Sequence, residues 1–333
     1  MSDDKGLICA YLMDGAGGGS RLDWQGVEAW NEDQGVLWVH LDRTEIESRR
    51  WLREDSGLQP EIIDSLLAKG SRPRAMAVGD SLLLYLRGVN LNVGEDPLHM
   101  VSVRMFASAS RIITVRRQHL MAVKDVQDAI ERGEGPSDPA QFLVHMAAAL
   151  TDRMHPMLSE LQDELEQLED EMEDLNYGAS KPRLAHIQRQ SIELRRYLAP
   201  QRDALRFLCE TDIEWLRRAN HLRLYGIVDQ ITRYVENLDA GKEQALVLHE
   251  QISDTLSEKM NRNMYLLSVL AGIFLPLDFV TGLLGVNIGG IPGTDSHWGF
   301  PLLLILLFSF GAVLIMMFHR FEWLRPIQRA SGR

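Results

Sequence analysis

Cysteine is scarce in this sequence, which has only Cys9 and Cys209 among its 333 residues. Two cysteines so far apart form neither a disulfide framework nor a metal-binding cluster, and they suit a reduced, cytoplasmic compartment. The ten histidines form no HxH or HxxxH pair, so the sequence predicts no tight tetrahedral zinc site. Acidic residues outnumber basic ones, and the net charge of −12 disfavours a nucleic-acid partner and attracts cations.

Segments that mark secretion or catalysis are also missing. Residues 1–5 are acidic and the next apolar run, residues 7–13, is short, so no signal peptide is expected. The glycines at 17–19 are not followed by the GK[ST] of a phosphate-binding loop. Residues 1–135 contain no catalytic constellation. We therefore expect neither an enzyme nor a tightly bound cofactor.

Long apolar runs, in contrast, are present near the C-terminus. Residues 264–285 contain one charged residue, Asp278, and residues 300–318 contain none. A helix of roughly 20 apolar residues spans the hydrocarbon core of a bilayer. The sequence therefore predicts two transmembrane helices, joined by a short loop, that anchor a large polar body in a lipid bilayer.

The orientation of this hairpin follows from the basic residues around it. The loop between the spans has no Lys or Arg. The basic residues that precede the first span are Lys259 and Arg262, and those that follow the second are Arg320, Arg325, Arg329 and Arg333. The positive-inside rule then places both termini in the cytoplasm.

Seven segments are expected along the chain. They are a cytoplasmic α/β domain (1–135), a helical hairpin (136–210), stalk helices (211–263), a first transmembrane helix (264–285), a periplasmic loop (286–299), a second transmembrane helix (300–319) and a cytoplasmic tail (320–333). In the first domain, β-rich runs at 36–41, 74–78, 81–90, 98–107 and 111–116 predict strands, and residues 45–53 and 61–68 predict short helices.

The helical hairpin has an acidic and a basic half. Apolar residues at alternating spacings of three and four over 157–175 predict a coiled-coil seam, and residues 176–182 are expected to form the turn. The return helix is rich in arginine, so the two helices are expected to pack antiparallel and to pair charges along their length. Glu169, Asp170, Glu171 and Glu173 are candidates for a cation-attracting surface. The alternative is an ordinary solvated, salt-bridged face.

A polar stripe follows one face of the last long helix before the loop. From Asp212 the pattern stays helical without a proline until Pro276. Residues 243–285 predict one continuous helix of roughly 65 Å, with Gly241 as a candidate break before it. The stripe residues recur at spacings of three and four: Glu250, Ser253, Ser257, Asn261, Met264, Ser268, Ala271, Leu275, Asp278 and Gly282. Lipid does not tolerate a facing carboxylate, and one hairpin cannot bury the stripe.

Several copies around an axis would turn each stripe residue into a ring. The stripe then predicts a pore lining, in which Met264 and Leu275 are candidate apolar constrictions. The alternative is a dry helix–helix seam, and the spacing alone does not give the number of copies.

A resemblance to a known family begins at Gly285-Val286-Asn287. A C-terminal pair of spans, the first ending in Gly-x-Asn before a short outer loop, resembles the CorA metal-ion transporter family. Phe274-Leu275-Pro276 lies upstream of this motif and the stretch IGGIPG lies downstream, which is similar to the ZntB-type zinc transporter branch. Magnesium-type members usually read Gly-Met-Asn at this place.

The resemblance implies a homopentamer of the cell inner membrane that takes up Zn²⁺, as a transported substrate, together with protons. It also implies that Gly285, Val286 and Asn287 form the outer selectivity filter. A magnesium or cobalt channel of the same family is the first alternative. The second, from a different class, is a membrane-tethered sensor or scaffold that transports nothing.

Two residues are expected to meet the metal transiently. A ring of Asn287 amides would hydrogen-bond a hydrated divalent cation without stripping its water; the alternative is an Asn that caps the helix. Asp278 would bind the metal or a proton, because carboxylates crowded around one pore do not all ionise. The alternative is a hydrogen bond from Asp278 to a neighbouring helix. His297 and Asp295 are a weaker candidate pair for zinc capture in the outer loop.

Overall fold

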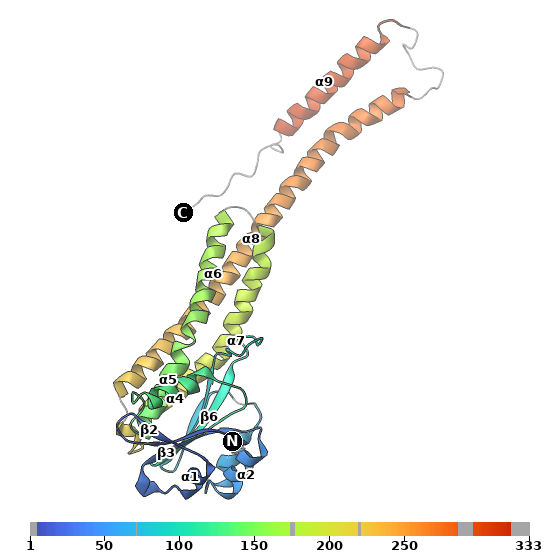
Figure 1. Ribbon diagram of the computed structural model, residues 1–333. Coiled ribbons are helices and arrows are strands. Elements are labelled where there is room, and N and C mark those ends of the chain that lie inside the picture. The colour runs from blue at the N-terminus through green and yellow to red at the C-terminus, as the bar shows by residue number, and fades with distance from the viewer. Residues whose placement is uncertain (1–4, 71, 174–176, 219–220, 286–295, 321–333) are drawn as a thin grey trace. The chain divides into compact units, whose positions relative to one another are not determined.

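The computed structural model describes residues 5–70, 72–173, 177–218, 221–285 and 296–320. The chain divides into two compact units, Met1–Glu250 and Gln251–Arg333. The first unit combines a β-sheet with helices, and the second contains the two apolar helical segments near the C-terminus (Figure 1). The expected α/β domain, long helices and C-terminal pair of apolar helices are therefore confirmed.

A mixed sheet of seven strands forms the core of the first unit, in the order β2-β1-β3-β7-β6-β5-β4. The strands are β1 (Leu7–Met13), β2 (Gly19–Leu22), β3 (Val36–Asp42), β4 (Arg74–Val78), β5 (Ser81–Gly88), β6 (Val101–Ala107) and β7 (Arg111–Arg116). Strands β3 and β7 run parallel, and the other neighbouring pairs are antiparallel. The predicted strands are confirmed, although β5 and β6 are shorter than their apolar runs.

Helices cover both faces of this sheet because its strands are apolar on both sides. They are α1 (Trp24–Ala29), α2 (Ile46–Glu54), α3 (Pro60–Leu67), α4 (Met121–Glu131) and α5 (Pro139–Asp152), with a short 3-10 turn, η1, at Glu32–Gln34. In β3, Leu37 and Val39 belong to the cluster that includes Trp51 of α2, whereas Trp38 belongs to the opposite cluster with Phe142 of α5. The predicted helices at 45–53 and 61–68 are confirmed to within one residue.

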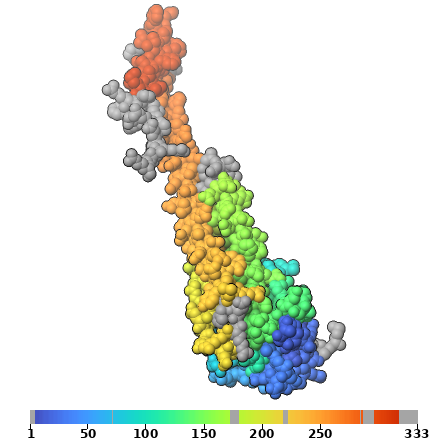
Figure 2. Space-filling view, turned by 90° about the vertical axis from the view of Figure 1, so that its left-hand side faces the viewer, coloured from blue at the N-terminus to red at the C-terminus, as the bar shows by residue number. Residues whose placement is uncertain are grey.

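The remaining helices are α6 (His155–Glu173), α7 (Tyr177–Glu210), α8 (His221–Gly285) and α9 (Gly299–Arg320), with a 3-10 turn, η2, at Leu216–Arg218. The hairpin of α6 and α7 is confirmed, and its seam buries Leu165 and Leu168 of α6 together with Leu184 and Ile187 of α7. In the first unit, the N-terminal part of α8 lies beside this hairpin (Figure 2).

Three local predictions were wrong. The expected turn at 176–182 is helical from Tyr177 onward, and α7 contains both Pro182 and Pro200. Each proline removes one backbone hydrogen bond, and burial of the apolar seam offsets this loss. Gly241 lies inside α8 without a break, and a Cβ there would make ordinary contact with Leu165 at 3.5 Å. Helix α8 begins only at His221, so the segment after Asp212 is not continuously helical.

The charge pairing between α6 and α7 is also more limited than expected. Among the described residues, Arg183 makes the ion pairs that join the two helices, to Glu164 at 3.3 Å and to Glu171 at 2.8 Å. Arg195 instead pairs with Asp239 of α8 at 2.6 Å. The basic helix α7 therefore forms ion pairs with two helices, α6 and α8, because α8 also lies close to it.

A buried histidine lies where β3 meets β7. His40 is opposite Thr114 in the strand register, and its Nδ1 is 2.8 Å from the Thr114 hydroxyl, which also accepts a hydrogen bond from Trp38 Nε1 at 2.9 Å. Burial, with Arg116 as a second cause, lowers the pKa of His40 from 6.5 to about 3. The folded chain therefore keeps His40 neutral at pH values where the unfolded chain protonates it.

This linkage predicts that acid destabilises the first unit. The contribution of His40 is complete above the unfolded pKa of 6.5 and is lost as the pH falls toward the folded pKa. The stability is expected to fall by about 2 kcal/mol between roughly pH 7 and roughly pH 5. Denaturant unfolding of the full chain in mild detergent, followed by tryptophan fluorescence, measures this change.

His40→Gln should remove that part of the pH dependence, and His186→Gln, at an exposed position of α7, is the matched control. An unchanged pH dependence in His40→Gln would show that other groups cause the acid sensitivity.

Candidate ion-conducting site

The second unit exposes a large apolar surface. Helices α8 and α9 each contain a stretch long and apolar enough to cross a membrane, and none of the residues in those stretches is buried. Phe279 of α8 is 71% exposed and Phe308 of α9 is 76% exposed. The core helix of a water-soluble protein would bury such side chains. The exposure therefore favours a lipid environment for both stretches.

The predicted polar stripe lies on the surface of α8. Nine of its ten residues are exposed in the single chain, and Ser253 is half-buried. The hydroxyls of Ser257 and Ser268 donate back to the carbonyls of Ser253 and Met264, each at 2.9 Å. Their lone pairs therefore remain available on the outer surface of the helix.

The opposite side of the same segment is more covered. Between residues 264 and 283, the half-buried residues are Val269, Gly272, Ile273, Pro276, Leu277 and Val280. Their spacings of three and one place them on one helix face, and no stripe residue is among them. The single chain thus covers one side of this segment and leaves the polar stripe uncovered.

Two stripe residues, Leu275 and Asp278, also lie beside α9. Both line a groove of about 860 Å³ between α8 and α9, together with residues such as Phe308 and Gly311 of α9. No described side chain forms an ion pair or hydrogen bond with the Asp278 carboxylate. The carboxylate is therefore uncompensated within an apolar setting, and a cation or a proton would stabilise it.

The outer motif is only partly described. Gly285 is the last residue of α8 and is exposed, whereas Val286 and Asn287 lie outside the described residues. Asp295 also lies outside them. His297 is exposed and precedes α9.

The acidic candidates near the end of α6 differ in their partners. Glu171 forms the ion pair with Arg183, and Glu169 accepts a hydrogen bond of 2.6 Å from Gln244 of α8. Asp170 is exposed and has no described partner, and the side chain of Glu173 lies outside the described residues. The uncompensated charge is therefore carried by Glu169 and Asp170 rather than by Glu171.

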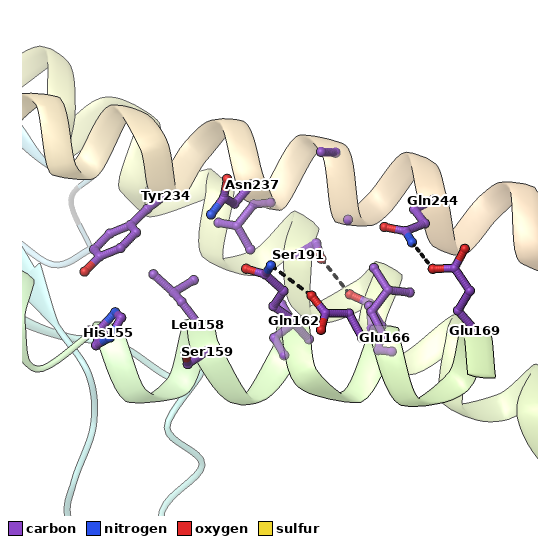
Figure 3. Close-up of a pocket in the computed structure, with 16 residues that line it drawn as sticks. His155, Leu158, Ser159, Gln162, Glu166, Glu169, Ser191, Tyr234, Asn237 and Gln244 are labelled. Atoms are coloured by element: carbon purple, nitrogen blue, oxygen red, sulfur yellow. Dashed lines mark hydrogen bonds between the residues drawn. The ribbon is translucent and has the colours of Figure 1, made fainter. Parts of the chain in front are cut away.

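Glu169 also lines a hollow of about 360 Å³ between α6, α7 and α8. Figure 3 shows Gln244 and Glu169 meeting across it, while Gln162 donates to Glu166 at 3.2 Å along α6. Both carboxylates at this end of the hollow are bound by neutral amides, which leave their negative charge in place.

The described residues contain no cluster of three or more His, Cys, Asp or Glu side chains that could hold a metal ion. The cysteines are unsuitable as ligands, because burial raises the thiol pKa of Cys9 to about 12 and that of Cys209 to about 11. Metals bind thiolates, and these thiols stay protonated at neutral pH.

Comparison with known proteins decides the family. A family model described as CorA-like Mg²⁺ transporter protein matches residues 33–320. The chain belongs to the CorA family. It is 39% identical over 325 residues to the divalent cation transporter CmaX of Pseudomonas aeruginosa, and the match covers 97% of this chain and 98% of that protein.

A second CorA-type relative is the zinc transport protein ZntB of Pectobacterium carotovorum. It is 34% identical over 321 residues, and the match covers 96% of this chain and 94% of that protein. The solved structure of full-length CmaX superimposes with a TM-score of 0.85 and covers 97% of this chain and 99% of that one. The chain is therefore a divalent cation transporter of the CorA family rather than an enzyme.

Sequence reasoning missed the α9 side of the site in this CorA-family chain. Gly311 and Ala312 line the groove opposite Asp278, and a Cβ on Gly311 would meet no atom within 4 Å. Two small residues in a run of large apolar ones were the signal that was available. The contact of Gln244 with Glu169 had no comparable signal, because it depends on how α8 lies beside α6.

The two kinds of acidic residue at the end of α6 should behave differently. The double variant Glu169→Gln with Asp170→Asn should lower metal flux into proteoliposomes at low ionic strength. It should leave the flux nearly unchanged above about 0.1 M salt, because exposed charges more than about 10 Å from the ion are then largely screened. Glu171→Gln is the control, because its charge is already balanced by Arg183. An equal loss of flux at low and high salt in the double variant would indicate structural damage instead of lost attraction.

Proposed function

We propose that this CorA-family chain is a zinc transporter of the cell inner membrane, that it works as a homopentamer, and that it couples zinc uptake to protons. The observation that supports this most is the uncovered polar stripe of α8, which continues through the apolar segment to Gly282. Zinc is favoured over magnesium by the 34% identity to ZntB and by the GVNIGGIPG stretch of this sequence.

The oligomer follows from the physics of the stripe. The Asp278 carboxylate cannot face hydrocarbon without a large loss of hydration, and the Ser268 hydroxyl adds a smaller cost on the same face. Identical copies that turn their stripes toward a common axis remove these groups from lipid and give each of them a symmetric set of neighbours. Five copies are proposed from the family resemblance.

In this arrangement the stripe lines the pore. Ser257, Asn261 and Ser268 would offer oxygen atoms to the water around the ion, and Met264 and Leu275 would form apolar constrictions that gate by excluding water. Gly285, Val286 and Asn287 would form the filter at the outer mouth. Both termini would lie in the cytoplasm, as the basic flanks of the hairpin predict.

Asp278 is proposed as the coupling group. A ring of these carboxylates would hold protons when no metal is present, because like charges crowded together do not all ionise. An arriving Zn²⁺ would stabilise the ionised form and displace protons. Metal occupancy and protonation at this level of the pore would then be linked, as coupled transport requires.

The test is Asp278→Asn in proteoliposomes that contain a zinc-sensitive dye. This substitution preserves shape and removes ionisation, so the variant should assemble, bind zinc more weakly and lose most of the pH dependence of zinc entry. Asp254→Asn is the matched control, since Asp254 is an exposed carboxylate of α8 outside the stripe.

Two results would contradict the proposal. Zinc entry with the full pH dependence in Asp278→Asn would place the proton route elsewhere. Entry of magnesium but not zinc in the unmodified protein would identify a magnesium channel, and entry of neither metal would favour a tethered sensor.

A further inference from the structure

We infer that the edge of the sheet at which β3 and β7 end is a binding site for a soluble anion that carries phosphate groups. This basic edge consists of the two loops that follow these strands, 43–45 and 117–120, and of the arginines around them. None of its residues belongs to the polar stripe of α8 or to the acidic candidates of α6. The inference concerns equilibrium binding and does not rest on zinc transport or proton coupling.

The topology of the sheet brings the two loops together within one copy of the chain. Strands β3 and β7 are adjacent and parallel, so both loops leave the sheet at the same edge. The helices that follow them cover opposite faces, since Trp51 of α2 belongs to one core cluster and Val126 of α4 to the other. Where adjacent parallel strands send their helices to opposite faces, ligands bind outside the carboxyl ends of the strands.

Three arginines gather at this edge. Arg43 and Arg117 lie in the two loops, and Nε of Arg49 in α2 donates to the backbone carbonyl of Arg43 at 2.7 Å. Burial first, and then the charges of Arg117 and Arg49, lower the pKa of Arg43, so both neighbours are close enough to repel it. Within the described chain none of the three forms an ion pair. Positive charge is therefore concentrated here in a chain whose net charge is −12.

Asp42 balances only part of this charge. Its carboxylate acts on Arg43 and also on Arg116, which is its partner in the register of β3 and β7. The same carboxylate accepts hydrogen bonds from the backbone N–H of Thr44 at 2.8 Å and from its hydroxyl at 2.5 Å. One carboxylate is thus shared between the ends of both strands, and the edge keeps a net positive charge.

The end of α3 holds two guanidinium groups beside the edge. Arg43 donates to the carbonyl of Ala68 at 2.6 Å, and Arg104 donates to that of Leu66 at 2.7 Å. Arg104 is 1% exposed, and its Nε and the Nε of Arg116 are buried donors with no partner in the described part of the chain. A guanidinium has five N–H donors, so these carbonyls fix the groups in place and leave other donors for an anion.

Two helices also begin at the edge without a side-chain cap. Helix α2 follows Glu45 and helix α4 follows Leu120, and neither residue caps the first turn. The acidic residue in the first turn of α2, Glu47, is paired with Arg50 at 2.9 Å, and α4 has no acidic residue in its first turn. Uncapped backbone N–H groups at a helix start favour a bound anion.

These donors suit phosphate better than a simple halide or a single carboxylate. Phosphate oxygens accept paired hydrogen bonds from a guanidinium and single ones from backbone N–H groups. A diphosphate or triphosphate has several charged oxygens along its length, so it can bind both loops at once. We therefore expect affinity to rise from sulfate to pyrophosphate.

The experiment measures equilibrium binding of radiolabelled pyrophosphate to the full chain in phosphatidylcholine nanodiscs, at low ionic strength, with empty discs subtracted and no divalent metal present. The unmodified protein should show saturable binding that unlabelled pyrophosphate displaces more readily than sulfate does. Arg117→Gln should weaken binding by roughly threefold or more, and Arg43→Gln together with Arg117→Gln by roughly tenfold or more, because charge-assisted hydrogen bonds are lost.

The variants are chosen to separate binding from folding and from general charge. Arg117 is exposed and makes no described hydrogen bond, so its replacement leaves the fold intact. Arg117→Lys keeps the charge and should restore part of the lost affinity. Arg189→Gln is the matched control, because it removes the same charge at an exposed position of α7 outside the basic edge, and it should leave binding unchanged.

Four results would overturn the inference. Absence of saturable binding to the unmodified protein would mean that the edge is covered, for example by a neighbouring copy. Unchanged binding in the double variant would place the anion elsewhere, and equal weakening in Arg189→Gln would indicate a general charge effect. Loss of pyrophosphate binding in discs that contain phosphatidylglycerol would identify a lipid headgroup, rather than a soluble anion, as the occupant.

Discussion

The cost of placing polar groups in hydrocarbon is the constraint on which the rest of this structure depends. Helix α8 contains a run of apolar residues that only a membrane can accommodate, and the same run presents Ser268, Asp278 and Gly282 on one exposed face. Neither lipid nor α9 satisfies that face in the single chain. In the proposed function, water within a symmetric assembly would solvate this face.

In the first unit, buried polar side chains find hydrogen-bond partners within the same chain. Where β3 meets β7, the Thr114 hydroxyl forms hydrogen bonds with both His40 and Trp38. Arg104, which is almost fully buried, donates to the carbonyl of Leu66 at 2.7 Å and to that of Ser65 at 3.3 Å near the end of α3. These hydrogen bonds all lie within one copy, although His40 Nε2 and Arg104 Nε have no hydrogen-bond partner among the described residues. The polar groups of the first unit are thus bound within one copy, whereas the polar face of α8 is the one that we propose meets other copies.

Part of the charge of the α6–α7 hairpin is likewise paired within the chain. Arg183 neutralises Glu164 and Glu171, and Arg195 pairs with Asp239, so part of the acidic surface is balanced within the chain. Glu169 is held by a neutral amide instead. The described acidic residues of α6 outside these ion pairs keep a negative charge that is spread along the helix, and such a surface attracts cations without binding them tightly.

Much of the fold could be predicted from the sequence, because its strands and spans have strong local patterns. The run at 111–116 predicted β7 to the residue, and the apolar runs predicted α9 and the end of α8. Pro182 and Gly241 led to the wrong predictions of a turn and a helix break. Intrinsic helix propensity is a weak guide where apolar residues such as Leu184 and Ile187 pack the helix against its neighbours. The groove beside Asp278 could not be predicted, because it depends on how α8 and α9 lie together.

Accessibility of the stripe to water in the membrane tests the central claim most directly. Single cysteines at Ser268, Ala271 and Gly282 would be compared with single cysteines at Val269, Ile273 and Val280, using a charged thiol reagent on the full chain in liposomes. Native Cys9 and Cys209 give little background, because they are buried. We expect rapid labelling at the first three positions and slow labelling at the second three. Equal labelling of both sets, or no labelling of the stripe, would contradict a water-filled pore lined by α8.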